Sequence, residues 1–107
     1  MSINRNSAGN PIYPVGNLVI SEDANFIAGD SPRVIDIAGT LGYNANTGYV
    51  RVDGSGDLLV EISHTGAGYL TQFTLKNGDN FSLSGLEVAR IRLTHSGTNT
   101  SYRLFAS

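Results

Sequence analysis

The only two histidines of the chain lie in two stretches that read almost alike, and imidazole suits both metal binding and acid–base catalysis near neutral pH. The stretches are EISHTGAGY (residues 61–69) and RLTHSGTNTSY (residues 92–102). In each, a histidine stands between two hydroxyl residues and is followed by a glycine and, further on, a tyrosine. Such a repeat is either a divided chemical site or one structural turn used twice.

The sequence does not supply enough further residues for the two histidines to form a metal site or a catalytic site. Zinc usually takes three or four protein ligands, so His64 and His95 would need a carboxylate such as Asp36 or Asp57, and no spacing fixes that geometry. The Gly-x-Ser-x-Gly elbow of serine hydrolases and the lysine-containing phosphate loop are both missing. We therefore expect no catalytic residue, no metal and no cofactor.

Alternation along the preceding strands favours the structural interpretation. We expect His64 and His95 to cap the core at strand ends, with one ring nitrogen bonded to a turn carbonyl or a hydroxyl. Gly66 and Gly97 would then permit the sharp turn that follows, and the next tyrosine would begin a new strand. Two such structural turns are expected to lie side by side at one end of the fold. The histidines share their parity with these apolar residues: Leu58, Val60 and Ile62, and Ile91 and Leu93.

The segment DGSGD (residues 53–57) offers a second candidate for metal chemistry. Asp53, Ser55 and Asp57 supply the oxygen ligands that calcium prefers. The segment lacks the further carboxylate that completes an EF-hand loop, and the same residues are common in tight turns. Calcium binding remains an open alternative to a plain turn.

The elements that must position these residues are short strands. Residues 53–54 (Asp-Gly) and 77–78 (Asn-Gly) are strong hairpin dipeptides, and nowhere does an apolar period of a helix persist over three turns. We predict an all-β fold, an antiparallel β-sandwich or jelly roll of about eight strands. The expected strands are 17–21, 25–30, 33–39, 48–54, 57–63, 70–75, 80–88, 89–95 and 101–106.

Length and composition limit the classes of function. A chain of 107 residues suggests a single domain, here residues 18–107. A formal charge of −2 gives no reason to expect nucleic acid or an anionic membrane as a partner. The absence of cysteine fits a reducing cytoplasm. No apolar segment resembles a signal peptide or approaches the roughly 18 residues of a membrane span.

Residues 1–17 are expected to form an extended N-terminal arm, because asparagine, glycine and proline disfavour a regular element there. Ile12, Tyr13 and Val15 are apolar and lie among prolines, so an arm laid on another subunit would use them as anchors. A second binding candidate is the loop at residues 42–49. Tyr43, Asn44, Asn46 and Tyr49 combine aromatic and amide groups there, as ligand and interface loops often do.

The C-terminal third carries a family resemblance. NGDNFSLSGLEVARIRLTHSGTNTSYRLFAS (residues 77–107) resembles the ending of small virion proteins of tailed bacteriophages. These proteins often close with Gly-Asp, a Ser-Gly-Leu turn, an alternating strand, His-Ser/Thr-Gly-Thr and a last strand led by Ser-Tyr-Arg. The resemblance implies a structural protein, such as a capsid decoration (cement) protein, and it carries no catalytic residues.

On this resemblance we expect a non-enzymatic virion protein that is assembled in the host cytoplasm and stabilises the phage head. Its expected partners are the major capsid protein or other virion proteins and further copies of itself, in a homotrimer. The alternative is a carbohydrate- or receptor-binding module of a tail fibre or baseplate. A cupin-like enzyme ranks last, because cupins need several histidines and a glutamate on one barrel face.

Overall fold

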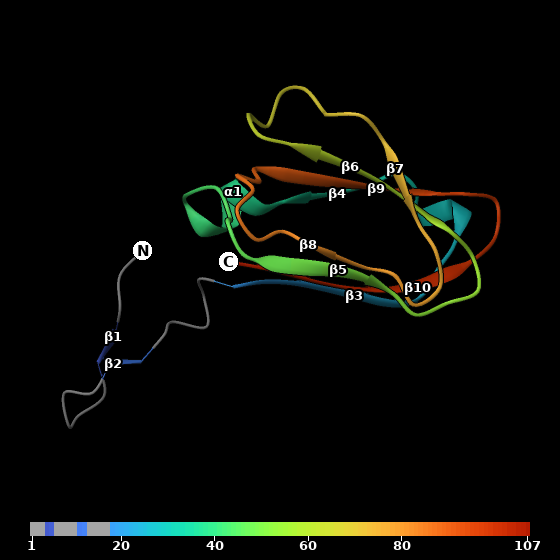
Figure 1. The fold of residues 1–107 in the computed structure, drawn as a ribbon, viewed down its shortest axis with the longest axis horizontal. Helices are drawn as coiled ribbons and strands as arrows, with labels where there is room; N and C mark the ends of the chain where they lie inside the picture. Colours follow the sequence, from blue (N-terminus) through green and yellow to red (C-terminus); the bar gives the residue numbers. More distant parts are fainter. Residues whose placement is uncertain (1–3, 6–10, 13–17) are drawn as a thin grey trace.

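The computed structural model describes residues 4–5, 11–12 and 18–107 of the chain. Within residues 18–107, eight strands form two four-stranded antiparallel sheets that face each other as a sandwich (Figure 1). The predicted antiparallel sandwich is confirmed. The first sheet has the order β3 (Val19–Phe26), β10 (Thr100–Ala106), β5 (Gly48–Val52) and β8 (Asn80–Ser82), and the second has the order β4 (Arg33–Asp36), β9 (Arg90–His95), β6 (Leu58–Ser63) and β7 (Phe73–Leu75).

The connections make this sandwich a jelly roll. Counted from β3 as the first strand of residues 18–107, the sheets read 1-8-3-6 and 2-7-4-5. Of these strands, only β6 and β7 follow each other within one sheet, and every other connection passes between the sheets. This is the double Greek key of a jelly roll.

The N-terminal region contributes one described pairing. β1 (Asn4–Arg5) and β2 (Pro11–Ile12) pair antiparallel, with Asn4 opposite Ile12. The predicted anchor Ile12 is thus known by its backbone alone, whereas Tyr13 and Val15 lie outside the described residues, as does most of the predicted arm.

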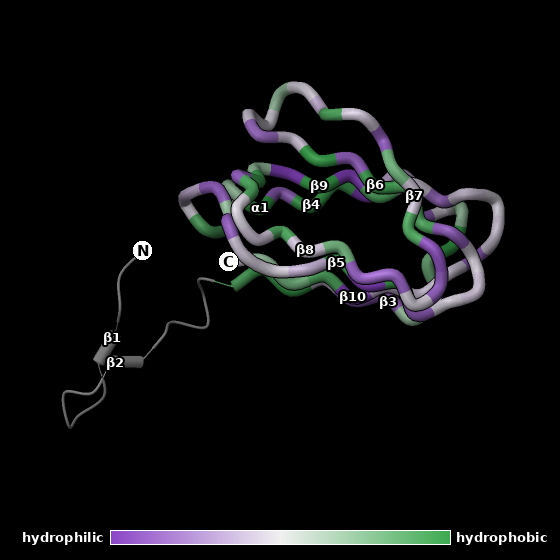
Figure 2. The backbone as a smooth tube through the Cα atoms, viewed as in Figure 1, coloured by the Kyte–Doolittle hydropathy of each residue, from purple (hydrophilic) through white to green (hydrophobic). Residues whose placement is uncertain are grey.

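The core follows the predicted alternation. Val50 and Val52 of β5 are fully buried, while Tyr49 and Arg51, which alternate with them, are only partly covered. β6 and β9 behave alike, and Figure 2 shows hydrophobic and hydrophilic residues alternating along them. One face of each sheet therefore points into a shared apolar layer, where Phe26 and Tyr102 are the largest fully buried side chains.

A short helix replaces the end of the strand predicted over 33–39. α1 (Ile37–Leu41) begins where the Asp36 carboxylate accepts a hydrogen bond from the Gly39 backbone at 3.0 Å. It ends at Gly42, whose φ of 85° lies in the left-handed region that glycine adopts cheaply. Five residues are too few to show a helical period, so alternation alone could not reveal this helix.

Other strand boundaries also differ from the predictions. The expected strands 17–21 and 25–30 are one strand, β3, because Glu22 and Asp23 between them lie in the paired register with β10. The segments predicted over 70–75 and 80–88 shorten to the three-residue strands β7 and β8. These two short strands are the neighbouring edges of the two sheets.

The two dipeptides predicted to close hairpins instead turn the chain from one sheet to the other. Gly78 has the expected positive φ of 86°. Gly54 does not have a positive φ. Glycine is needed there because a Cβ would lie 2.4 Å from the Ser101 backbone nitrogen. The Asp-Gly and Asn-Gly dipeptides thus form turns between the two sheets of a jelly roll, in which most paired strands are far apart in the sequence.

Candidate functional site

The two histidine turns lie at opposite ends of the sandwich, so the prediction that they sit side by side is wrong. β6 and β9 are antiparallel neighbours, with Leu58 opposite His95 and Ser63 opposite Arg90. His64 follows the end of β6, whereas His95 ends β9, and antiparallel strands end on opposite sides of a sheet. The two imidazoles therefore cannot share one metal ion. Gly66 and Gly97 do have positive φ values, 81° and 110°.

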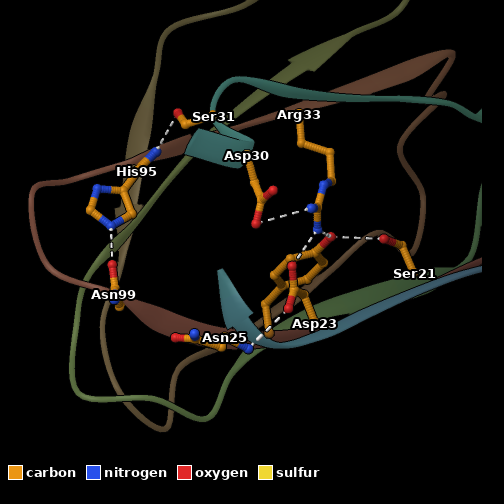
Figure 3. Close-up of polar contacts among 9 residues, drawn as sticks. Ser21, Asp23, Asn25, Asp30, Ser31, Arg33, His95 and Asn99 are labelled. Atoms are coloured by element: carbon orange, nitrogen blue, oxygen red, sulfur yellow. Dashed lines mark hydrogen bonds and ion pairs between the residues drawn. The ribbon is translucent and has the colours of Figure 1, made fainter. Parts of the chain in front are cut away.

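His95 forms a compact turn of its own (Figure 3). The Gly97 backbone N–H donates to its Nδ1 at 3.0 Å, and its Nε2 lies 2.9 Å from the Asn99 side-chain oxygen. The half-buried ring packs against Phe26 with 6.1 Å between centroids. The His95 backbone N–H donates to Ser31 Oγ at 2.8 Å, which joins this turn to the start of β4.

His64 is exposed, which corrects the expectation that it caps the core. Its ring nitrogen Nδ1 bonds to the Glu87 carbonyl, the kind of turn-carbonyl partner that was predicted. The Asn44 side chain donates to the His64 carbonyl at 2.9 Å. Parity failed because β6 ends at Ser63, so alternation no longer applies at the next residue.

We expect replacement of His95 by glutamine to cost more stability than the same change at His64. His95 loses a ring contact and a paired turn, at about 1–2 kcal/mol. His64 loses one bond in an exposed position, at less than about 1 kcal/mol. Urea unfolding followed by circular dichroism measures both. Equal losses would contradict the different environments.

The described part of the chain has a pocket at the β7–β8 edge, here called the edge pocket. It has a volume of about 370 Å³, at the lower end of the range for ligand sites. The rings of Phe73 and Phe81 lie 4.6 Å apart between centroids and close it from the two sheets. Its lining is almost entirely apolar and consists of Ile62, His64, Leu70, Thr71, Phe73, Phe81 and Leu86.

The β6–β7 loop (residues 64–72), which projects from the second sheet in Figure 1, forms one wall of the edge pocket and is anchored at several points. The Leu70 backbone N–H donates to the Ile62 carbonyl at 2.8 Å. Tyr69 lies under the Arg92 guanidinium, 4.1 Å from ring centroid to Cζ, and does not begin a strand as predicted. Arg92 also makes two bonds to Glu61, at 3.0 and 2.7 Å. The wall is therefore held in place before anything binds.

A second polar cluster joins β3 and β4, the edge strands at the opposite side (Figure 3). Arg33 Nη1 donates to Asp23 and to the Tyr102 hydroxyl, each at 2.8 Å, and Nη2 lies 3.5 Å from Asp30. The buried Tyr102 hydroxyl shares a further 2.8 Å bond with Ser21. The hydrogen bonds to Tyr102 and to Asp23 raise the pKa of Arg33. Since every group is paired, we interpret this cluster as a clasp between the two sheets.

Acid is expected to weaken the fold through its ion-paired carboxylates. The Arg92 hydrogen bonds lower the pKa of Glu61 below its usual 4.5. The Asn25 backbone N–H and Arg33 lower the pKa of Asp23 below 3.8. A group whose pKa is lower in the folded state binds fewer protons there, so its stabilisation is complete above about pH 5 and is lost as the pH falls below 4. Thermal melts between pH 2 and 7 test this, and Glu61→Gln should flatten the slope. An unchanged slope would contradict it.

The predicted loop of tyrosines and asparagines does not converge on one groove. Tyr49 lies on the outer face of the first sheet, stacked on Phe105 at 6.1 Å between centroids. Asn44 instead bonds the end of β6 in the other sheet. Tyr43 packs against the core, and Asn46 is exposed, with its backbone bonded to Ser107.

The carboxylates of the calcium candidate are paired with cations. Asp53 bonds Arg103 at 2.7 Å and Arg51 at 3.0 Å, and Asp57 lies 3.3 Å from Lys76. Among the residues that the structure describes, no group of three or more His, Cys, Asp or Glu side chains is placed to hold a metal ion.

Comparison with protein-family models, with curated proteins and with solved structures gives no significant match to this chain. In the part of the chain that the structure describes, no helix is long and apolar enough to cross a membrane. The fold itself defines the class: an eight-stranded jelly-roll β-sandwich over residues 18–107, with an apolar pocket at one edge.

Sequence reasoning missed the edge pocket and the Arg33 clasp. The pocket draws its lining from residues 62 to 86 on three strands and two loops, and the clasp joins residues that are far apart in the chain. The one available signal was Leu70, a large apolar residue in a short glycine-rich segment.

Proposed function

We propose that this chain is a non-enzymatic structural protein of a tailed-phage virion, and that it decorates and stabilises the head. The observation that carries the proposal is the jelly-roll topology, an architecture that viral capsid domains use widely. The resemblance of residues 77–107 to small virion proteins supports the same conclusion independently of the topology. The topology supports the proposal as a fold-level analogy.

The ion pairs of the sandwich are consistent with a structural role. Within the described residues, the carboxylates of Asp23, Asp53 and Glu61 are all paired with arginines. In each pair the arginine favours the charged form of the carboxylate and joins two segments of the sandwich. The large apolar side chains that stay open to a partner are Leu70 beside the edge pocket and Ile20, Ile27 and Val34 elsewhere.

The experiment is binding to heads. Heads that lack the protein, prepared from the phage whose genome encodes this chain, are mixed with the purified protein and sedimented. We expect saturable co-sedimentation and greater resistance of the heads to heat. Heads that sediment without the protein, or that gain no heat resistance, would refute head decoration.

The alternative of a carbohydrate- or receptor-binding module keeps one favourable observation. Tyr49 and Phe105 form a half-buried aromatic pair beside the Arg51–Asp53–Arg103 ion pairs on an outer sheet face. Aromatic faces next to charged groups are common in sugar sites. Binding on a glycan array that Tyr49→Ala abolishes would favour this module, and an array without any signal would eliminate it.

A further inference from the structure

The edge pocket is an open apolar site at the edge of the sandwich. Phe73 and Phe81 come from β7 and β8, which among the described strands each have one neighbour. Leu70 at its rim is 52% exposed, so the apolar surface of the pocket extends to the outside of the loop. Apolar surface of this kind is stabilised by covering it, and an edge strand offers backbone groups to an extended segment.

The chain carries a segment of matching chemistry at its N-terminus. Residues 11–15 read Pro-Ile-Tyr-Pro-Val, so three apolar side chains stand among two prolines. Proline restricts the backbone to extended conformations, which lowers the entropy lost when such a segment binds. A pocket of about 370 Å³ has room for one or two large side chains.

The distance from Leu18 to the pocket decides whether the N-terminal segment of the same molecule can enter it. β3 and β8 are the two edges of one sheet, three strand spacings or about 14 Å apart. Through the pairing of β8, β5, β10 and β3, Phe81 lies level with Ser21. Ser21 is three residues, or about 10 Å, along the chain from Leu18. The straight-line offset is therefore about 17 Å.

The five residue steps from Leu18 back to Tyr13 span about 17 Å when fully extended. Tyr13 could then reach the pocket of its own molecule only along a straight line through the sandwich. Ile12, one residue further, reaches about 20 Å, which leaves about 3 Å for the path around β10 and β5. A neighbouring copy has no such limit.

We infer that the edge pocket is the docking site for the N-terminal segment, residues 11–15, of a second copy of this chain. Each copy gives one segment and receives another, either reciprocally in a dimer or head-to-tail in a closed ring. The inference deepens the proposed structural role, on which it rests for its biological purpose. Self-association through this contact is measured without any phage head, so the inference and the proposed function can fail separately.

The test uses full-length chains. Leu70→Asp places a charge at the exposed rim of the pocket, and Ile12→Ser with Tyr13→Ser removes the apolar segment. Val34→Asp is the matched control, since Val34 is 49% exposed and lies on β4, at the opposite edge of the same sheet as β7. Light scattering after size exclusion gives the mass of each, and thermal melts check that each is folded.

We expect the wild type and Val34→Asp to form the same closed oligomer, and the pocket and segment variants to associate at least tenfold more weakly. Mixing these two variants should restore one contact, because one retains the segment and the other retains the pocket. Native mass spectrometry would then detect a heterodimer.

Three results would overturn the inference. They are a monomeric wild type, a Leu70→Asp variant that assembles like the wild type, and a mixture of the two defective variants that forms no heterodimer. A segment that fills the pocket of its own molecule would give the first of these results. Loss of head binding with normal assembly would instead refute the proposed function and leave this contact intact.

Discussion

Replacing Gly48 with alanine is expected to destabilise the sandwich by about 3–5 kcal/mol, a large part of the stability of a domain of this size. The added Cβ would lie 2.0 Å from the Phe105 carbonyl oxygen and 2.9 Å from the Ala106 Cα. These are backbone atoms of β10, which is paired on both sides and cannot move away. The φ of 131° at Gly48 adds strain for any L side chain.

Urea unfolding followed by circular dichroism measures the effect. Gly68→Ala is the matched control, because no atom lies within 4 Å of a Cβ at that position and its φ is not positive. We expect this control to be within about 0.5 kcal/mol of the wild type. A Gly48→Ala protein that unfolds at the urea concentration of the wild type would mean that β5 and β10 are not held at this distance.

Replacing Tyr102 with alanine is expected to cost about 3–5 kcal/mol. Tyr102 is fully buried on β10, an inner strand of the first sheet, and its ring meets the Phe26 ring edge-on with 5.7 Å between centroids. Removing the ring leaves a cavity and also takes away the hydroxyl partner of Arg33. Both losses fall at the place where β3, β4 and β10 meet.

Tyr102→Phe separates the ring from the hydroxyl. It keeps the packing and loses the bonds to Ser21 and Arg33, so we expect a cost of about 1–2 kcal/mol. Calorimetry or urea unfolding compares the two variants. If Tyr102→Phe were as unstable as Tyr102→Ala, the polar clasp and not the packing would be the main contribution of this residue.

Prediction from the sequence succeeded where a local pattern decides the outcome. Val50 and Val52 point inward because period-two alternation fixes which face of a strand is apolar, whatever its neighbours are. The same reasoning failed at His64, one residue past the end of β6, and at α1, whose five residues are shorter than the pattern needed to detect them.

The candidate site depended on information that the sequence does not carry locally. The residues of the Arg33 clasp were not singled out, because Asp23, Arg33 and Tyr102 meet only when β3 and β4 become matching edges of two sheets. The edge pocket likewise requires Phe73 and Phe81, from strands of different sheets, to face each other.

By itself, the sequence determined that this chain folds as an antiparallel β-sandwich, since alternation and turn residues are properties of neighbouring positions. The tertiary structure alone decided the jelly-roll order of the strands, the opposite placement of two nearly identical histidine turns, and the apolar pocket at the β7–β8 edge. The physical reason is that strand pairing is a long-range choice. Its free energy depends on which distant side chains share a face, and no short stretch of residues encodes that.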